Sequence, residues 1–257
     1  MSSFSINEIK ACKAVVNLYE TGDFVGKYDT VVVLDDHAGI TYGRTQTTEN
    51  SGGIWTLLFD TYAELKGVFS NDFEKYKEKL YKAGSDTSLK DNLSENEEFK
   101  ELLKRSAQED PKMRKAQDQY FHVQYFRPAQ QLAADYEITQ PLILAAFYDT
   151  SIHSGSSGME KHVNDFNEGW VGSGSEQGEL LEERDWGLGY MKYRRNWLAT
   201  FNGKSEGHTK AVRGTVYRID SLIDLAERGE WRLATPVNVK LVSKNHELND
   251  EILKNVW

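Results

Sequence analysis

Three carboxylates near the start of the chain have the types and the spacing that glycosidic-bond hydrolysis requires. Glu20 lies in the segment YETG, and Asp35 and Asp36 follow directly on the apolar run VVVL. Hydrolysis of a glycosidic bond uses one carboxylic acid to protonate the leaving oxygen, and a second carboxylate to attack or to activate water. The chain holds 40 acidic residues, and Asp is also an ordinary turn residue, so composition alone leaves this pairing a hypothesis.

A helix predicted from Ser5 to Tyr19 would position Glu20. Ser5 and Glu8 fit a capping box, and apolar residues recur on one face of the segment. Gly22 suits the left-handed conformation that ends many helices. The helix dipole disfavours a charged carboxylate at this end, which is the behaviour that a proton donor needs.

The second element needed is a small sheet that would carry the two aspartates. Residues 28–48 have the pattern of short strands around a turn at 35–39. Side chains alternate along an extended strand, so adjacent acids at its end point in opposite directions and only one of them can face a cleft. Residue types alone do not say which of the two that is.

The rest of the chain is predicted to be mainly helical. A proline at position 128 is expected to interrupt one helix, and Pro141 is expected to open a buried one. The polar or glycine-rich stretches 82–99 and 155–180 are predicted to be loops. The helical patterns after the sheet cover residues 54–66, 69–81, 114–136, 140–155, 184–201 and 209–228.

Composition excludes several classes of protein. The net charge of −9 argues against a nucleic-acid-binding protein, which usually shows a basic face. No stretch of eighteen apolar residues is present, so no membrane-spanning segment is predicted. The first residues have no basic start followed by an apolar run, so no signal peptide is expected there. The one cysteine, Cys12, excludes an internal disulfide and is predicted to be a core residue.

Other chemistries have little support in the sequence. GSGSEQG superficially resembles a phosphate loop, but it follows no predicted strand and lacks the lysine. The six histidines do not show metal-ligand spacings, and His153 is predicted to be a core histidine. We therefore expect neither a metal nor a cofactor.

Over about residues 5–240 the chain resembles the chitosanases of glycoside hydrolase family 46. In that family a helix ends in Glu, and an Asp follows after a similar interval, before a glycine-containing turn with a Thr. Here YETG supplies Glu20, and LDDHAGITYGR supplies Asp36, sixteen residues later, and Thr41. KAQDQYFHVQYFRPA and AAFYDTSIHSG resemble two further helices of the family.

The resemblance also covers a group of charges behind the catalytic glutamate. It places Asp149 on the family's buried aspartate, and it places Arg194 and Arg218 on two buried arginines. An arginine behind a buried acid fixes the position of the carboxyl group and moderates its affinity for protons. These three residues are therefore expected to form a supporting network for Glu20.

The resemblance implies a fold and an activity. The fold is mainly α (α+β), a lysozyme-like fold with a small β-sheet in the catalytic lobe and a cleft between two lobes. One catalytic domain would cover 1–257, with the first helix and the sheet forming a lobe of about residues 1–60. The implied reaction is inverting endo-hydrolysis of β-1,4 bonds in chitosan. In it Glu20 is the general acid, Asp36 is the general base, and Thr41 holds the attacking water.

Contacts with the substrate are expected as well. Tyr28, Arg44 and Glu49 are expected to contact the sugar, and Glu49 could substitute for the acid that the family pattern has near Gly53. The partner is a polysaccharide, chitosan or another aminosugar polymer, and neither nucleic acid nor membrane is expected. The enzyme is expected to be a monomer that acts outside the cell, with any signal peptide removed or export occurring by another route.

Several positions depart from the family pattern. Gly53 and, in a less secure alignment, Phe201 stand where the family has acids, and Ala38 and Ser154 replace an Arg and a His. Because acids in the family meet glucosamine ammonium groups, these departures keep peptidoglycan open as an alternative substrate. The acidity of the chain counts against that alternative, since bacterial walls are themselves anionic. A non-catalytic sugar-binding protein is a further alternative, and the retention of Glu20 and Asp36 disfavours it.

Overall fold

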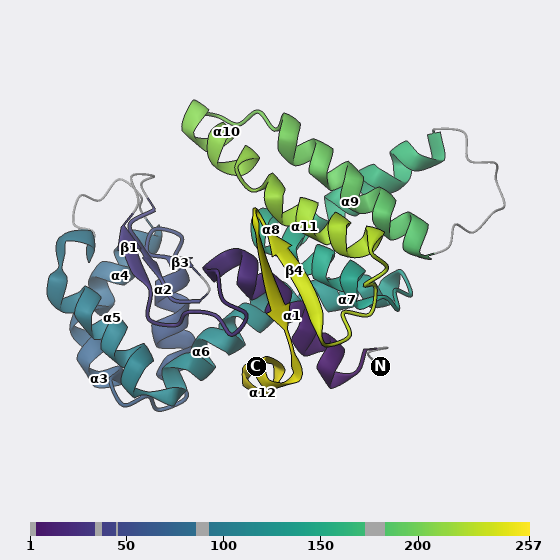
Figure 1. Ribbon diagram of the computed structural model, residues 1–257. Coiled ribbons are helices and arrows are strands. Elements are labelled where there is room, and N and C mark those ends of the chain that lie inside the picture. The colour runs from purple at the N-terminus through teal and green to yellow at the C-terminus, as the bar shows by residue number, and fades with distance from the viewer. Residues whose placement is uncertain (1–3, 34–37, 45, 86–92, 173–182) are drawn as a thin grey trace. The chain divides into compact units, whose positions relative to one another are not determined.

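The computed structural model describes residues 4–33, 38–44, 46–85, 93–172 and 183–257, and over these residues the protein is mainly helical with two small sheets (Figure 1). The chain divides into two compact units. Unit 1 comprises residues 1–25 and 124–257, and unit 2 comprises residues 26–123. These units do not coincide with lobes of 1–60 and the remainder, because the first helix packs with the C-terminal part of the chain.

Helix α1 (Ile6–Thr21) begins and ends as its sequence predicts. The Ser5 hydroxyl accepts a hydrogen bond from the Glu8 amide, and the Glu8 carboxylate accepts one from the Ser5 amide, which completes the capping box. Gly22 has a φ of 73°, and its N–H donates to the Leu18 carbonyl. A residue with a side chain is strained at this φ, so glycine ends the helix just after Glu20 at little cost.

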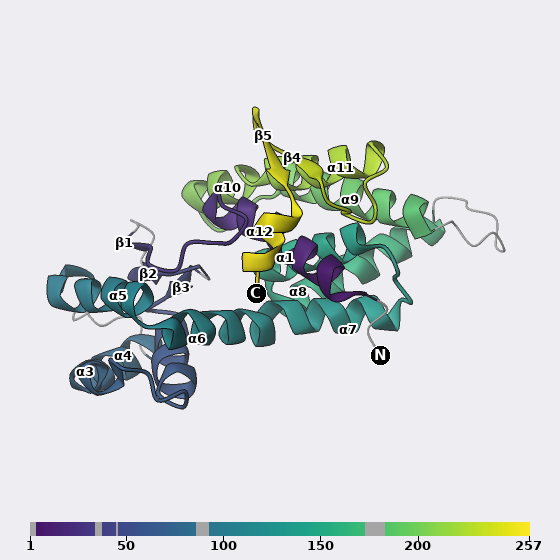
Figure 2. The same ribbon diagram turned by 60° about the horizontal axis from the view of Figure 1, so that its bottom comes forward.

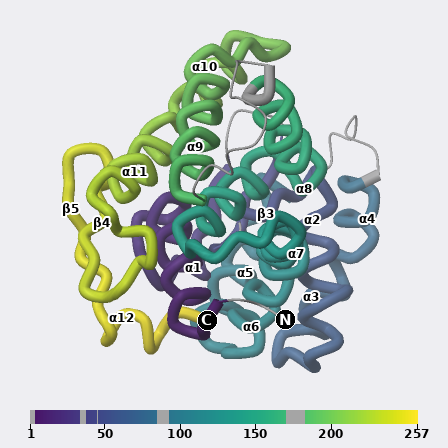
Figure 3. Tube along the Cα trace, turned by 90° about the vertical axis from the view of Figure 1, so that its right-hand side faces the viewer, coloured from purple at the N-terminus to yellow at the C-terminus, as the bar shows by residue number. Residues whose placement is uncertain are grey.

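The centre of unit 1 is α8 (Pro141–Gly172), whose first half is apolar on all sides. Helices α1, α7 (Arg127–Asp135), α9 (Glu183–Thr200) and α11 (Val216–Glu227) all pack against it (Figures 1 and 3). Residues 142–148 are all essentially inaccessible to solvent. A helix that is covered on every side has no polar face, which is why its sequence reads as a continuous apolar run.

The C-terminal part of unit 1 differs from its sequence prediction. The predicted helix over 209–228 is two helices, α10 (Glu206–Arg213) and α11, separated at Gly214 and Thr215. Strands β4 (Val237–Leu241) and β5 (Lys244–Leu248) pair as an antiparallel hairpin that lies beside α11 (Figure 2). A short helix, α12 (Asp250–Asn255), packs on α1.

The loop predicted for 155–180 is wrong over its first part. Helical structure extends to Gly172, but α8 consists of two helical segments that meet at a kink at Gly155, whose φ of 72° and ψ of 169° are not helical. Residues 173–182 lie outside the described residues. The polarity of the segment reflects its position at the surface rather than an absence of helix, since many of its side chains are partly or fully exposed.

Unit 2 contains a three-stranded antiparallel sheet in the order β1–β2–β3. The strands are β1 (Val31–Val33), β2 (Ile40–Tyr42) and β3 (Thr47–Thr48), and Thr41 pairs with Val32 and with Thr48. Ile40 and Tyr42 belong to the apolar core of the unit. Because side chains alternate, Thr41 points to the opposite face of the central strand.

The helices of unit 2 are short and are interrupted by tighter or wider turns. Elements α2 (Gly53–Trp55), η1 (Thr56–Tyr62), α3 (Ser70–Phe73), η2 (Glu74–Tyr76), α4 (Lys77–Ser85), η3 (Leu93–Glu95) and α5 (Glu97–Glu109) surround a core that Tyr62, Phe73 and Phe99 dominate. The predicted helix over 114–136 is α6 (Pro111–Phe121), a π-helical turn η4 (His122–Phe126), and α7. The π-helical turn directly precedes the proline at position 128, which confirms the predicted interruption.

None of the helices in the described ranges has the length and apolar character that a bilayer crossing needs.

Candidate active site

Glu20 lies in the last turn of α1. Residues before and after it in the sequence make hydrogen bonds that fix the backbone of this turn. The Asn17 amide group donates to the Phe24 carbonyl at 2.9 Å, and the Thr21 hydroxyl donates to the Asn17 carbonyl at 2.9 Å. The Tyr19 hydroxyl donates to Ser221 on α11 at 3.0 Å and ties the two helices together. The backbone carrying Glu20 is therefore fixed within unit 1.

Arg218 connects Glu20 to Asp149. Its Nε donates to an Asp149 carboxylate oxygen at 2.8 Å, and its Nη2 lies 2.6 Å from the same oxygen and also donates to Glu20. The three side chains are at most 10 % exposed. Burial alone would lower the pKa of Arg218, but the charges of Asp149 and Glu20 outweigh that effect and raise it. Arg218 is thus a permanent cation shared by the buried Asp149 and the partly buried Glu20.

Two tyrosines that the sequence analysis did not single out lie close enough to Glu20 for its negative charge to affect their pKa. Burial first, and then that charge, raises the pKa of Tyr125 and of Tyr217, so both phenols stay protonated at neutral pH. Tyr217 directly precedes Arg218 on α11. Its position next to Arg218 in the segment YRIDSL is the sequence signal that could have identified Tyr217.

Arg218→Ala should lower stability and activity together. It leaves Asp149 and Glu20 buried without their cation, and breaking such a group costs about 3–5 kcal/mol. Chemical denaturation measures this loss. The matched control is Arg195→Ala. Arg195 is half-exposed, and its Nε lies 2.5 Å from a carboxylate oxygen of Asp220, which is on the same helix as Arg218. Because exposed ion pairs contribute about 0–1 kcal/mol, the control should change little. Equal effects of the two variants would refute the supporting role.

Arg194 is buried, but its hydrogen bonds do not go to the carboxylates. Within the described residues its Nη1 contacts His162 Nε2 at 3.1 Å, its Nη2 donates to the Ser154 hydroxyl at 3.0 Å, and its guanidinium lies 4.4 Å from the Trp197 ring centroid. Burial lowers the pKa of Arg194, and neighbours that include Asp149 offset part of that effect. Of the three predicted network residues, the structure therefore brings Arg218 and Asp149 to Glu20 and gives Arg194 a separate set of partners.

The histidines beside Arg194 give a pH-dependent expectation. Burial first, and then nearby arginine charge, lowers the pKa of both His153 and His162 to about 4 from an ordinary 6.5. Between these values the unfolded chain holds more protons than the folded one. The stability that comes from keeping these rings neutral is therefore present in full above pH 6.5 and lost as the pH falls toward 4.

The free energy of unfolding, measured between pH 4 and 7, should fall with decreasing pH. The slope gives the number of protons taken up on unfolding, and His162→Gln should lower that number by roughly one. His246→Gln, a change in a half-buried histidine of β5, serves as the control. An unaltered slope in His162→Gln would contradict the assignment.

In unit 2, Thr41 is 6 % exposed on the central strand, and the loop after it carries an ion pair. Arg44 pairs with Asp118, and the Tyr28 hydroxyl donates to Asp118 at 3.0 Å. The Gln117 side chain accepts from the Arg44 amide at 3.0 Å and donates to the Tyr28 carbonyl at 2.9 Å. Asp118 was not selected as a functional residue, although it belongs to the AQD motif that carries the family resemblance. Asp36 and Asp35 lie outside the described residues.

Arg44 and Glu49, which were expected to contact the sugar, are buried in unit 2. They are 2 % and 1 % exposed, so neither has accessible surface to offer a ligand. The Glu49 carboxylate accepts hydrogen bonds from the amides of Ile40 at 3.1 Å and Leu93 at 2.6 Å, and so holds the sheet loop to η3. Tyr28 is partly exposed, but Asp118 occupies its hydroxyl.

A side chain at Gly53, where an acid was expected from the family pattern, would have to displace its neighbours. A Cβ atom at this position would lie 2.6 Å from the Thr47 methyl group and 3.0 Å from the Tyr120 hydroxyl. The surroundings have therefore closed around the glycine, and an aspartate could enter only if they moved. The glycine at position 53 is therefore required by the packing of its neighbours in unit 2.

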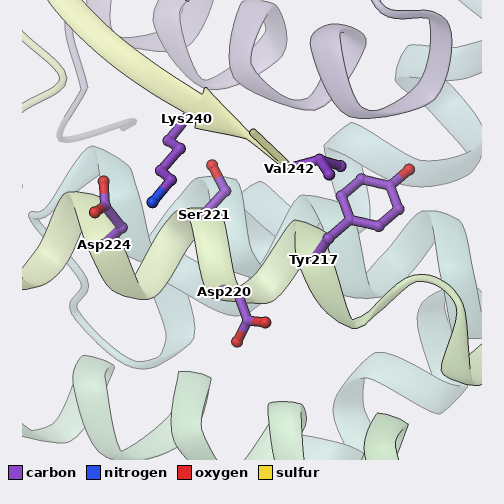
Figure 4. A pocket seen from close by; sticks show the side chains of 6 residues that line it. All are labelled: Tyr217, Asp220, Ser221, Asp224, Lys240 and Val242. Atoms are coloured by element: carbon purple, nitrogen blue, oxygen red, sulfur yellow. The ribbon is translucent and has the colours of Figure 1, made fainter. Parts of the chain in front are cut away.

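A shallow cavity of about 290 Å³ between α11 and β4 is mixed in charge (Figure 4). Lys240 extends toward Asp224 and Ser221, while Asp220 points away from them and pairs with Arg195. Within the described residues, no group of three or more His, Cys, Asp or Glu side chains could hold a metal ion.

Comparison with solved structures identifies the fold. A chitosanase from Bacillus subtilis MY002 in complex with 6 GlcN matches with a TM-score of 0.79 and 23 % identity, over 95 % of this chain and 98 % of that one. A family 46 chitosanase from Gynuella sunshinyii in complex with chitotetraose matches with a TM-score of 0.77 and 21 % identity, over the same shares. The mainly helical fold with a small sheet is thus the lysozyme-like fold of these glycosidases.

The family follows from the sequence match. The model of glycosyl hydrolase family 46 matches residues 15–237, so this chain belongs to that family. A chitosanase of Bacillus subtilis (strain 168) is 24 % identical over 238 residues, which are 90 % of this chain and 81 % of the relative. The range that the family model matches contains Glu20, Asp149 and Arg218.

Proposed function

We propose that this glycosidase is an endo-acting chitosanase that cleaves β-1,4 bonds of chitosan with inversion. The observation that carries the proposal is the Glu20–Arg218–Asp149 group, in which the partly buried Glu20 carboxyl is fixed by an arginine that it shares with Asp149. Glu20 is the general acid that protonates the leaving oxygen. Asp36 is the general base that takes a proton from water, and Thr41 holds that water.

The roles of the supporting residues follow from their contacts. Arg218 and Asp149 fix the Glu20 carboxyl, and Arg194 acts as a positioning residue for the middle of α8 through Ser154 and His162, which lie on either side of Gly155. Inversion requires room for a water between the two carboxyl groups, which means a separation of about 6.5–9.5 Å when substrate is bound. A separation of about 5 Å between Glu20 and Asp36 in a substrate complex would indicate retention instead.

The proposal extends to the setting of the reaction. Relatives named as chitosanases act on a glucosamine polymer, and we propose the same polymer for this chain, met outside the cell by a monomeric enzyme. The catalytic residues are all protein side chains, so no step assigned here uses a metal or a cofactor.

A second candidate substrate is the glycan strand of peptidoglycan. The packing around Gly53 favours this candidate, because it excludes an acid that in the family meets the glucosamine ammonium group. Separate incubations with chitosan and with purified peptidoglycan decide between the two polymers. Release of reducing ends from chitosan alone supports the first proposal, and release from peptidoglycan alone replaces it with the second. If both polymers stay intact in the presence of folded protein, both proposals fail.

A further inference from the structure

Side chains from three helices of unit 1 meet at its surface, where α8 packs against both α7 and α9 (Figure 3). They are Tyr136 at the C-terminal end of α7, Asn164 and Asn167 on α8, and Trp186 on α9. We call these four residues the Tyr136 surface. It shares no residue with the group that holds Glu20 or with the cavity between α11 and β4.

Tyr136 is the outermost of a row of aromatic rings that begins in the core of unit 1. The buried Tyr190 ring is nearly parallel to that of Trp186, with centroids 5.8 Å apart, and Phe147 and Phe166 meet Trp186 at steep angles. The Tyr136 ring lies on the other end of the row, 6.0 Å from Trp186 and inclined to it by 27°. Tyr136 is 36 % exposed, so an anchored ring is presented to solvent.

A chain of hydrogen bonds fixes this ring and ends in a free amide. Trp186 Nε1 donates to Asn167 Oδ1 at 3.0 Å, and Asn167 Nδ2 donates to the Tyr136 hydroxyl at 3.3 Å. The hydroxyl then donates to Asn164 Oδ1 at 3.3 Å. Asn164 is exposed, and its Nδ2 donates to no other group among the described residues. Two N–H donors are therefore available beside the exposed ring.

The segments that carry the Tyr136 surface are strongly acidic. Seven acids and two bases occur in residues 135–137, 160–168 and 183–186, whereas the whole chain has 40 acids and 31 bases. Glu160 and Glu168 lie one turn before and one turn after Asn164, on the same exposed face of α8. Neither forms an ion pair within the described ranges, and Lys161 between them pairs with Asp165 at 2.6 Å.

These features together select the chemistry of a ligand. The apolar face of a sugar ring fits against an exposed aromatic ring, and sugar oxygens can accept hydrogen bonds from an amide. The carboxylates of Glu160 and Glu168 favour a ligand that carries positive charge. A neutral glycan would leave these carboxylates without a counter-charge, and an anionic glycan such as that of the bacterial wall would be repelled by them.

We propose that the Tyr136 surface binds a segment of glucosamine polymer outside the catalytic group. A sugar ring lies against Tyr136, its oxygens accept from Asn164, and ammonium groups lie beside Glu160 and Glu168. The inference rests on the proposed chitosan hydrolysis for the choice of polymer. A second attachment point raises the effective concentration of a long chain at the enzyme, so it matters for polymer and not for short oligomers.

The first experiment measures adsorption without cleavage. The full chain carrying Glu20→Gln is incubated with cross-linked chitosan beads at about pH 5.5, where glutamate is charged, and the protein left in solution is measured. Tyr136→Ala in this background should weaken adsorption about tenfold, because it removes the exposed ring. Glu160→Gln combined with Glu168→Gln should also weaken adsorption and make it less sensitive to salt.

Tyr81→Ala is the matched control, because it removes a tyrosine of α4 in unit 2 that is 62 % exposed. It should adsorb like its parent, and thermal melting should show that all variants are folded. Adsorption that Tyr136→Ala leaves unchanged, or that both tyrosine variants weaken equally, would overturn the inference. Unaltered adsorption of the double glutamine variant would overturn it as well, since the ligand would then not be recognised by its charge.

The second experiment compares two substrates with Glu20 intact. Tyr136→Ala should release reducing ends from a soluble glucosamine hexamer at the parent rate, and from the beads several-fold more slowly. A general structural defect would lower both rates and would contradict the inference. If the parent cuts neither substrate while Tyr136→Ala still loses adsorption, the proposed hydrolysis fails and the binding surface stands. If the parent cuts both and all variants adsorb alike, the binding surface alone fails.

Discussion

Glu20→Gln is expected to lower the turnover of the preferred polymer by about 10²–10⁴-fold, because the amide cannot protonate the leaving oxygen. The fold should be retained, since the glutamine carbonyl oxygen can still accept the hydrogen bond from Arg218. Turnover is measured as reducing ends released under saturating substrate, and folding is measured by thermal melting.

Asp23→Asn is the control for this prediction. Asp23 is an exposed carboxylate three residues after Glu20, and it accepts the amide hydrogen of Val25 at 2.8 Å, which asparagine can also do. Turnover of the control should match the parent. If Glu20→Gln keeps near-normal turnover, another group supplies the proton and the assignment of the general acid is wrong.

Asp36→Asn should have an equally large effect, for a different reason. The asparagine keeps the shape of the side chain but cannot take a proton from the attacking water, so the rate should fall by about 10²–10⁴-fold. The assay is hydrolysis of whichever polymer the parent chain cuts, with melting as the check on folding.

The neighbouring residue provides the sharpest comparison for Asp36. Asp35→Asn makes the same chemical change one position earlier, where an extended chain points its side chain to the other side. It should lose far less activity and show mainly a change in stability. A folded but inactive Asp35→Asn alongside a nearly normal Asp36→Asn would reverse the assignment of the base.

Elements with strong local signals were predictable from the sequence. The Ser5–Glu8 capping box, the left-handed Gly22 and the interruption before position 128 all depend on interactions within a few residues, and all are present. The hairpin β4–β5 was missed although VNVKL of β4 alternates, because KNHEL of β5 is almost entirely polar and gives no strand signal of its own. Polarity misled the prediction for 155–172, where an exposed helix surface looks like a loop.

The candidate site was predictable only in part, because charge partners depend on tertiary structure. The contact of Arg218 with Glu20 and Asp149 joins residues far apart in sequence, and the family motifs alone indicated it. The same motifs did not distinguish Arg194, whose partners His162 and Ser154 carry no sequence signal. The burial of Glu49 was not predicted, because its carboxylate binds the backbone amides of Ile40 and Leu93, which residue types do not reveal.

The way the chain is divided between the two units has a consequence for the order in which the protein can form. Unit 2 is one continuous stretch, residues 26–123, so it is complete as soon as the ribosome has released it. Helix α1 is synthesised first, but α8, α11 and α12, which it contacts, are synthesised long afterwards. Helix α1 therefore cannot make these contacts until the C-terminal part of the chain has been synthesised. The surroundings of Glu20 therefore form last, after a loop of about a hundred residues has closed, which slows folding relative to a chain with local contacts. A nascent chain stopped before Arg218 would contain a finished unit 2 but not the support of its proposed proton donor.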